Sequence, residues 1–185
     1  SEMCIRDRPF SLTIKKVTGN ENIVSISYPD LIKDVRRGSC ILIDDGNIEL
    51  KVEKISQDTI YCTVIHGGTI SNRKGVNVPG VHLSMPFLSK QDTSDLLFGI
   101  KEDMDFIAAS FTRSAEDIQN LRKFLHENGG DSMKIIAKIE NQEGVDNIDE
   151  ILDYAYGVMV ARGDLGIEIE AEKLSLIHIS EPTRP

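Results

Sequence analysis

A lysine and two carboxylates lie at or just beyond the ends of two apolar segments in the C-terminal half of the sequence. Lys138 and Glu140 are two residues apart at the end of the segment 134–140, and Asp164 follows the segment 157–161. Residues spaced by two in a strand project to the same side. If the two strand ends meet, the carboxylates can hold Mg²⁺ while the lysine steadies a phosphoryl group.

The sequence after the second segment, Arg162-Gly163-Asp164-Leu165-Gly166, adds backbone donors to this candidate site. Its glycines permit a tight turn, and free N–H groups at the start of a helix favour a carboxylate or a phosphate. Other interpretations stay open at this point. Lysine and glutamate spaced by two are more often a solvated pair, and Arg162-Gly163-Asp164 matches the adhesive tripeptide of extracellular ligands.

The composition narrows the class of protein. The net charge is -9, with 30 acidic and 21 basic residues, which argues against a nucleic-acid binder and against binding to an anionic membrane surface. The three cysteines, Cys4, Cys40 and Cys62, suggest neither a disulfide framework nor a zinc site. No apolar run is long enough to span a bilayer. We therefore expect a cytoplasmic, globular protein.

Residues 10–80 alternate apolar and polar side chains in short segments separated by Gly, Asn and Asp. This pattern predicts a small antiparallel β-barrel or sandwich. Asp45-Gly46-Asn47 is expected to form a hairpin turn. The segment 75–86 carries two prolines and two glycines, which predicts a linker or a hinge between domains.

Beyond this linker the sequence alternates helix and strand patterns. Helices are predicted over 89–99, 114–127 and 144–155, and strands over 105–111, 134–140 and 157–161. In the first helix, Leu96, Leu97 and Ile100 are expected to form a buried stripe. The strands are almost continuously apolar, which predicts a parallel sheet buried on both faces, in a doubly wound fold or a (β/α)8 barrel. Three strands cannot close a barrel, so we expect a part of a larger domain.

Several motifs in the same order resemble the pyruvate kinase family: LIDDGNIEL, NRKGVNVPGV, LSKQDTSDLLFGI, DFIAASFTR, IIAKIENQEGVDNIDEIL and GVMVARGDLGIEI. The resemblance implies an α/β fold, a partial (β/α)8 TIM barrel with an inserted small all-β barrel domain that acts as a lid. It also implies the last step of glycolysis, phosphoryl transfer from phosphoenolpyruvate to ADP. Mg²⁺ or Mn²⁺ is the implied cofactor, with K⁺ in the complete enzyme.

The resemblance assigns roles to individual residues. Lys138 matches the catalytic lysine that stabilises the phosphoryl group, Glu140 and Asp164 match the metal ligands, and Asp45 and Lys74 match lid residues that bind the nucleotide. The implied substrate-binding residues are Ser110, Lys138, Ala161, Arg162, Gly163 and Asp164.

The resemblance also divides the chain into domains. Residues 10–81 are expected to form the lid, incomplete at its N-terminus, and residues 82–173 the central part of the barrel. The stretches 1–9 and 174–185 have no counterpart in the family and are expected to be non-native tails. The full-length parent is expected to be a homotetramer. We expect negligible turnover from the chain alone, because much of the barrel is absent and exposed strand edges favour aggregation.

Two alternatives accompany this interpretation. One is an Mg²⁺-dependent lyase of the phosphoenolpyruvate/pyruvate barrel superfamily, in which paired Glu and Asp ligands hold an enolate. The other is a non-catalytic adhesive module that uses Arg162-Gly163-Asp164. A requirement for ADP separates the kinase from the lyase, and burial of the tripeptide would dismiss adhesion.

Overall fold

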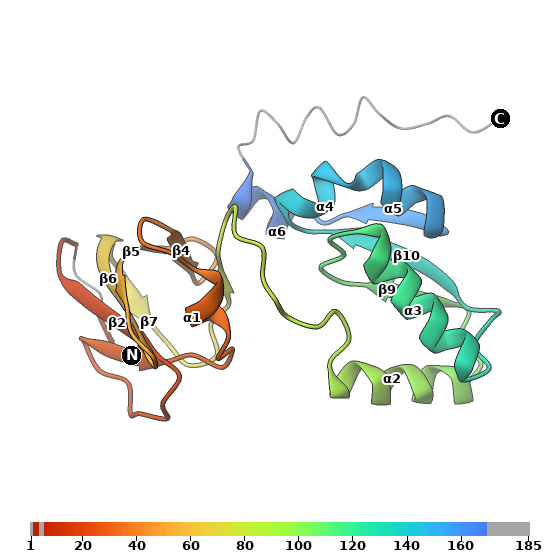
Figure 1. Ribbon diagram of the computed structural model, residues 1–185, viewed down its shortest axis with the longest axis horizontal. Coiled ribbons are helices and arrows are strands. Elements are labelled where there is room, and N and C mark those ends of the chain that lie inside the picture. Colours follow the sequence, from red (N-terminus) through yellow and green to blue (C-terminus); the bar gives the residue numbers. More distant parts are fainter. Residues whose placement is uncertain (1, 4–5, 170–185) are drawn as a thin grey trace. The chain divides into compact units, whose positions relative to one another are not determined.

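The computed structural model describes residues 2–3 and 6–169, which divide between Met85 and Pro86 into two compact units (Figure 1). We call them the β unit and the α/β unit. The predicted tail at 174–185 lies outside the described residues, as do residues 170–173 of the expected barrel segment. No helix among the described residues is long and apolar enough to cross a membrane.

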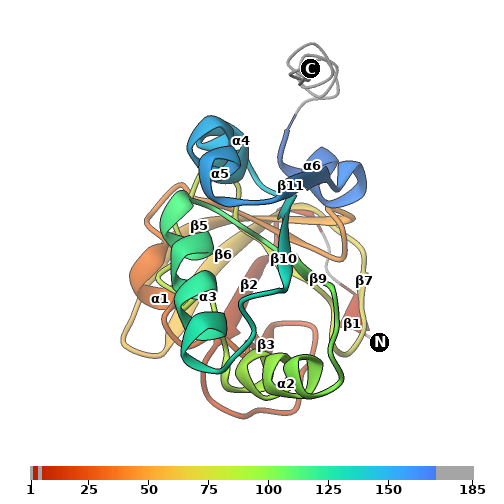
Figure 2. The ribbon, with the colours of Figure 1, turned by 90° about the vertical axis from the view of Figure 1, so that its right-hand side faces the viewer.

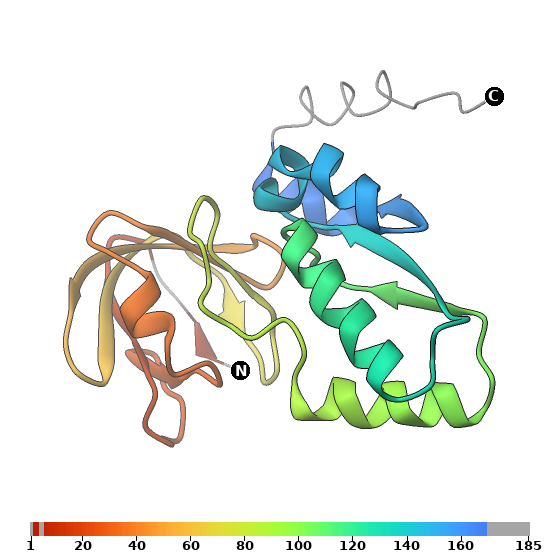
Figure 3. The same cartoon turned by 45° about the vertical axis from the view of Figure 1, so that its right-hand side comes forward.

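The β unit is built on a curved six-stranded sheet with the strand order β3-β2-β6-β5-β4-β8 (Figure 3). Neighbouring strands are antiparallel except β2 and β3, which are parallel. A two-stranded ribbon, β1-β7, and a short helix, α1, complete the unit. The elements are β1 (Glu2–Met3), β2 (Pro9–Thr13), β3 (Ile23–Ser25), α1 (Leu31–Asp34), β4 (Cys40–Ile43), β5 (Ile48–Ile55), β6 (Thr59–His66), β7 (Thr69–Ile70) and β8 (Val76–Asn77).

Alternation along the strands builds the core of the β unit. In β5, Ile48, Leu50 and Val52 are fully buried while the residues between them are partly or fully exposed. Burying an aliphatic side chain of this size contributes about 1.5–3 kcal/mol relative to leaving it in water. The same alternation in β2, β4 and β6 adds further buried residues to one continuous cluster.

The predicted hairpin turn is confirmed between β4 and β5. Asp45 and Gly46 have φ angles of 55° and 84°, and the Asn47 N–H donates to the Asp44 carbonyl at 3.0 Å. Asp44 also has a positive φ, of 57°, and the register pairs Ile43 with Ile48, so the turn spans four residues and requires a left-handed backbone at three of them. Gly46 meets this requirement without steric cost.

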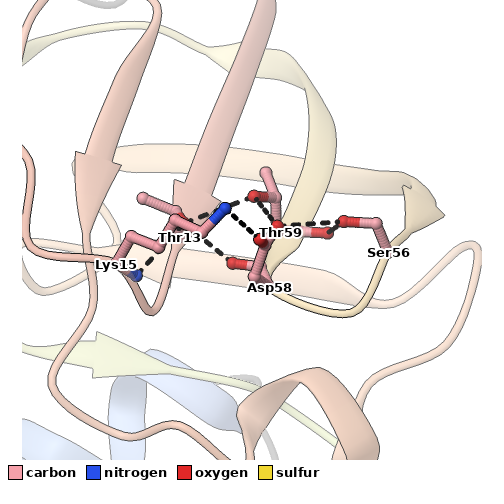
Figure 4. A network of polar contacts seen from close by, with 5 residues as sticks. All are labelled: Thr13, Lys15, Ser56, Asp58 and Thr59. Atoms are coloured by element: carbon pink, nitrogen blue, oxygen red, sulfur yellow. Dashed lines mark hydrogen bonds and ion pairs between the residues drawn. The ribbon is translucent and has the colours of Figure 1, made fainter.

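A polar network joins β2 to the turn between β5 and β6 (Figure 4). We call it the hairpin network, and it consists of Thr13, Lys15, Ser56, Asp58 and Thr59. The Thr13 hydroxyl donates to the Asp58 carbonyl at 2.8 Å, and the Thr59 hydroxyl donates to Asp58 Oδ1 at 2.8 Å. Lys15 completes it with an ion pair to Asp58. The network satisfies the buried hydroxyls of both threonines.

The expected linker is only partly separate from the β unit. Val76 and Asn77 form β8, which pairs with β4, and Val78 is buried in the core of the β unit. The division between the units falls after Met85, at the end of the proline- and glycine-rich segment.

The α/β unit contains a three-stranded parallel sheet with the strand order β11-β10-β9, which confirms the predicted parallel pairing (Figure 2). Helices alternate with these strands along the chain. The elements are α2 (Lys90–Lys101), β9 (Phe106–Ala109), α3 (Ala115–Glu127), β10 (Lys134–Ile139), α4 (Gln142–Asp146), α5 (Ile148–Tyr154), β11 (Gly157–Val160) and α6 (Arg162–Glu168).

Only one face of this sheet is buried among the described residues. Ile135, Ala137 and Ile139 of β10 pack in one cluster with α3 and α5. Neighbouring strands expose Phe106 and Met159, which are 53% and 49% accessible. The prediction of burial on both faces is therefore wrong for the described residues, because no described element of the α/β unit buries these side chains.

Two helix predictions also need correction. Leu97 was expected in the buried stripe of α2 but is 47% exposed. The helix expected over 144–155 is two helices, which meet at Asn147. The Asn147 side chain donates to the Arg113 carbonyl at 2.9 Å, so a tertiary hydrogen bond accompanies the break.

Candidate active site

The carboxyl ends of the three parallel strands lie side by side at one end of the sheet, which we call its carboxyl edge. Ala109 is in register with Ala137, and Val160 is in register with Ile139. Just beyond, the Ala161 N–H donates to the Ile139 carbonyl at 3.1 Å. Side chains that directly follow these strand ends therefore gather at the same edge, where α/β barrels place their active sites.

Three of the predicted site residues are in direct contact at this edge. The Lys138 ammonium donates to Glu140 Oε1 at 2.6 Å and to the Ser110 hydroxyl at 3.1 Å. The Glu140 side chain is 2% exposed, and that of Lys138 is 24% exposed. Withdrawing a carboxylate from water is costly unless it is paired and hydrogen-bonded. The lysine provides that pairing, so a buried carboxylate and a half-buried ammonium group form one unit rather than a solvated surface pair.

A backbone N–H completes the environment of the Glu140 carboxylate. The Phe111 N–H donates to Glu140 Oε2 at 2.6 Å. Phe111 has a φ of 52°, in the left-handed region that residues other than glycine rarely adopt. We call Ser110, Phe111, Lys138 and Glu140 the strand-edge cluster. Each carboxylate oxygen of Glu140 accepts one hydrogen bond within this cluster.

The loop that carries Phe111 is held on several sides. The Thr112 N–H donates to the Lys138 carbonyl at 3.2 Å, and its hydroxyl donates to the Ala109 carbonyl at 2.9 Å. The next residue, Arg113, contacts the Asp117 carboxylate through its backbone N–H and its guanidinium group. A set of bonds of this kind holds a strained backbone in place.

Gly144 of α4 packs directly against this loop. A Cβ atom at this position would lie 2.5 Å from the Thr112 carbonyl oxygen, closer than real Cβ contacts allow. The Gly144 N–H also donates to Asn141 Oδ1 at 2.7 Å, which caps the helix. Only glycine fits this approach without moving the loop or the helix.

The predicted residues after β11 lie on the same edge in the first turn of α6. Arg162 and Gly163 are exposed, whereas Ala161 and Asp164 are half-buried. Among residues 6–169, no hydrogen bond or ion pair joins Asp164 to Lys138 or Glu140. A contact that the sequence did not suggest ties α6 to the neighbouring loop, because Glu168 Oε2 accepts the Gln142 N–H at 3.2 Å.

The two predicted nucleotide-binding residues belong to the β unit. Lys74 forms its ion pair with Asp44 at 2.7 Å rather than with the predicted Asp45. The hydrogen bond to Asp44, followed by its charge, raises the pKa of Lys74, with a smaller contribution from Asp45. The same hydrogen bond lowers the pKa of Asp44. Sequence reasoning missed Asp44, although it directly precedes Asp45 in the DDG motif.

The donor set at the strand edge suits a hard divalent cation. Glu140 and Asp164 supply carboxylate oxygens, the ligand type that Mg²⁺ prefers. The described residues contain no group of three or more His, Cys, Asp or Glu placed to hold a metal. Mg²⁺ commonly binds through one or two carboxylates and takes its remaining ligands from water and substrate phosphate. Two carboxylates therefore fit that way of binding.

Fold and site together define a class of protein: a domain of the (β/α)-barrel type with a buried lysine–glutamate pair at the carboxyl edge of its parallel strands. The sequence model of the barrel domain of pyruvate kinase matches residues 8–180. The chain belongs to the pyruvate kinase family.

Individual relatives agree with this assignment. The pyruvate kinase of Sporosarcina psychrophila is 48% identical over 175 residues, which cover 94% of this chain and 30% of that protein. That of Geobacillus stearothermophilus is 49% identical over 168 residues, 90% of this chain and 29% of that protein. The chain thus spans about a third of the length of these relatives.

A solved structure shows the same fold. A crystal structure of a pyruvate kinase from Cryptosporidium parvum is 39% identical, with a TM-score of 0.89. The alignment covers 95% of this chain and 37% of that one. This chain is therefore similar in structure to part of a pyruvate kinase, a partial barrel with a small all-β domain, as the fold prediction stated.

Proposed function

We propose that this chain is the part of a pyruvate kinase that contains its phosphoryl-transfer site. The observation that carries the proposal is the Lys138–Glu140 pair at the strand edge, 2.6 Å apart and hydrogen-bonded to Ser110 and to the Phe111 N–H. The reaction breaks the bond between phosphorus and the enol oxygen of phosphoenolpyruvate. It forms a bond to the terminal phosphate of ADP, and the enolate left behind takes up a proton to become pyruvate.

Lys138 is proposed as the catalytic residue. Phosphoryl transfer depends mainly on positioning and on neutralising charge that spreads over the phosphoryl oxygens. The Lys138 ammonium, held at the carboxyl ends of the strands by Ser110 and Glu140, can provide that neutralisation. The Ser110 hydroxyl fixes the direction of the lysine and borders the same space, so it is assigned to substrate binding.

Glu140 and Asp164 are proposed as the protein ligands of Mg²⁺ or Mn²⁺. The cation, when bound, would supply positive charge that offsets the negative charge on the substrate oxygens during transfer. The carboxylate of Glu140 is fixed in place by Lys138 and by the Phe111 N–H. Asp164, in the first turn of α6, is half-buried at the same edge. K⁺ is proposed as a further cofactor of the complete enzyme.

The residues at the start of α6 are proposed to bind the carboxylate of phosphoenolpyruvate. These are Ala161, Arg162, Gly163 and Asp164, of which Arg162 and Gly163 are exposed. Because Arg162 and Gly163 are exposed, the adhesive alternative is not dismissed by burial of the tripeptide. Membership of the kinase family favours substrate binding instead.

The β unit is proposed to serve as the lid, with Asp45 and Lys74 binding the nucleotide. The Asp44–Lys74 ion pair supports a role for this turn, since it fixes the lysine beside two aspartates. The boundaries 10–81 and 82–173, and the assignment of 1–9 and 174–185 as non-native tails, stay predictions. We also propose that the complete protein is cytoplasmic and a homotetramer.

A chimera tests the proposed function. Residues 10–169 replace the matching segment of the Geobacillus stearothermophilus relative, and pyruvate formation from phosphoenolpyruvate is measured with and without ADP. We expect ADP-dependent turnover, and Lys138→Met should reduce kcat by about 100- to 1,000-fold because it removes a charge that stabilises the transition state. A chimera that folds but shows no turnover would contradict the proposal. Pyruvate formation that persists without ADP would also contradict it.

A further inference from the structure

The strongest unexplained feature at the site is the backbone of Phe111. Its φ of 52° is unfavourable for a residue with a side chain, and the residue is 50% exposed, so burial of its side chain does not account for the conformation. Strained backbone of this kind persists where surrounding contacts enforce it, and it is enriched at functional sites. In this loop the left-handed residue is also the one whose N–H contacts Glu140 at 2.6 Å.

We propose that Phe111 is a positioning residue whose left-handed backbone directs its N–H to Glu140 and fixes the orientation of that carboxylate for a divalent cation. The inference rests on the proposed function, which makes Glu140 a metal ligand. Groups that orient a metal ligand through a hydrogen bond typically change metal affinity by about 10- to 100-fold when they are lost. A charge-assisted bond from a backbone N–H is suited to this role, because it is short and strong.

The two partners of Glu140 differ in how they respond to a cation. Lys138 contacts Oε1 and is itself positive, so a second cation at this carboxylate repels it. The Phe111 N–H contacts Oε2 and carries no net charge. The backbone bond is therefore the one that persists when a metal binds, and it keeps the carboxylate from turning while the lysine is redirected.

The loop around Phe111 is built to maintain this direction. The bonds from Thr112 to the Lys138 and Ala109 carbonyls fix the residue that follows Phe111. Gly144 allows α4 to pack against the Thr112 carbonyl from the other side. These contacts hold the peptide group between Ser110 and Phe111, so the N–H is aimed before any ligand arrives.

Replacing Phe111 in the full chain by its α-hydroxy analogue tests the proposal, because the resulting ester lacks only the N–H. Mn²⁺ binding is followed by electron paramagnetic resonance. We expect the Kd for Mn²⁺ to rise by about 10- to 100-fold. The matched control is the same ester at Lys134, at the other end of β10, whose N–H donates to the Asp105 carbonyl at 2.8 Å, and it should change the Kd by less than about threefold.

Side-chain variants test the role of the conformation. Phe111→Gly keeps the N–H and adopts positive φ freely, so the Kd should stay near that of the unmodified chain. Phe111→Val keeps the N–H but disfavours positive φ more strongly, so the Kd should rise. In nuclear magnetic resonance spectra, the Phe111 amide proton should resonate far downfield, keep that position when Mg²⁺ is added, and lose it in Glu140→Ala.

The outcomes separate the inference from the function on which it rests. If the Phe111 ester binds Mn²⁺ normally while Glu140→Gln abolishes binding, the positioning role is wrong and the metal site stands. Equal weakening by both esters would show a general loss of structure and would also overturn the inference. If Glu140→Gln leaves Mn²⁺ binding unchanged, both the metal role of Glu140 and the inference are wrong.

Discussion

The hairpin network of the β unit and the strand-edge cluster of the α/β unit both combine a lysine, a carboxylate and at least one hydroxyl group, but they bury different parts. In the hairpin network, Lys15 and Asp58 lie toward the surface, and the buried groups are the hydroxyls of Thr13 and Thr59. In the strand-edge cluster the carboxylate itself is buried.

This difference separates a structural network from a functional one. Exposed ion pairs contribute little to stability, whereas buried hydroxyls need partners, so the hairpin network serves to close a turn. A buried ion pair is seldom a net source of stability, since desolvation offsets the attraction between the charges. The strand-edge cluster is therefore better explained by chemistry at the sheet edge than by stability.

The largest effect is expected when one member of the buried pair is removed. Lys138→Met leaves Glu140 buried without its cation, and we expect the free energy of unfolding of the α/β unit to fall by about 3 kcal/mol. The exposed counterpart, Lys15→Met, should lower the stability of the β unit by a much smaller amount. Urea unfolding followed by circular dichroism of the helices, which lie almost entirely in the α/β unit, measures the effect of Lys138→Met, and the amide nuclear magnetic resonance signals of β2, β5 and β6 follow Lys15→Met in the β unit.

A double variant sharpens this contrast. Lys138→Met combined with Glu140→Gln removes both charges, so much of the stability lost in the single variant should return. Mn²⁺ binding should be lost in the double variant, because Glu140→Gln removes a proposed metal ligand. A double variant less stable than Lys138→Met would show that the pair itself is stabilising.

The next largest effect concerns the packing that supports the strand-edge cluster. In Gly144→Ala the new methyl group meets the Thr112 carbonyl, and we expect a loss of about 2 kcal/mol together with faster hydrogen exchange at Phe111. Gly99→Ala is the matched control, because Gly99 is also buried in a helix. There the methyl group would lie 3.5 Å from the flexible Met104 side chain. This control should be neutral or up to about 1 kcal/mol stabilising.

Much of the fold could be predicted because it depends on local periodicity. Alternation of period two in the β unit and of helix and strand in the α/β unit is visible in the sequence, and Asp45-Gly46 specifies its own turn. The break at Asn147 could not be predicted, since it accompanies a hydrogen bond to Arg113, which is distant in the sequence. Leu97 was misplaced because an apolar position on a helix does not reveal which neighbour covers it.

The candidate site was predictable only where side-chain type carries the information. Lys138 and Glu140 were paired from their spacing and from the motif, and the structure brings them together. The Phe111 N–H could not be found in this way, because every residue except proline has one and phenylalanine gives no signal of positive φ. Gly144 carried a partial signal, since glycine inside a helix usually has a packing reason.

A smaller effect is expected from a buried hydroxyl of the hairpin network. Thr59→Val removes the hydroxyl that donates to Asp58 and contacts the Thr13 hydroxyl, and the β unit should lose about 1 kcal/mol. Thr63→Val is the matched control on the same strand, because Thr63 is half-buried and forms no side-chain hydrogen bond among residues 6–169. Thermal unfolding of the β unit should separate the two variants, and equal losses would contradict a role for the network.

The smallest effect is expected from the Lys15–Asp58 pair, which makes the stability of the β unit depend on pH. Hydrogen bonds from Lys15 and Thr59 lower the pKa of Asp58 below its ordinary value of 3.8. A carboxyl group whose folded pKa is depressed stabilises the protein above its unfolded pKa, and this contribution is lost as the pH falls through the folded pKa. At neutral pH, urea unfolding should therefore give a higher free energy of unfolding of the β unit for the unmodified chain than for Asp58→Asn. This difference in stability should disappear in acid.

The pKa values of Asp34 and Asp44 are also lowered, so the whole protein loses stability in the same acidic range. The contribution of the Lys15–Asp58 pair is therefore measured as the difference in stability between the unmodified chain and Asp58→Asn. Because Lys15 and Asp58 lie toward the surface, high salt should also reduce this difference in stability at neutral pH. The buried Lys138–Glu140 pair is screened much less, so the effect of Lys138→Met on stability should barely respond to salt. A salt response of equal size in both networks would remove the distinction between them.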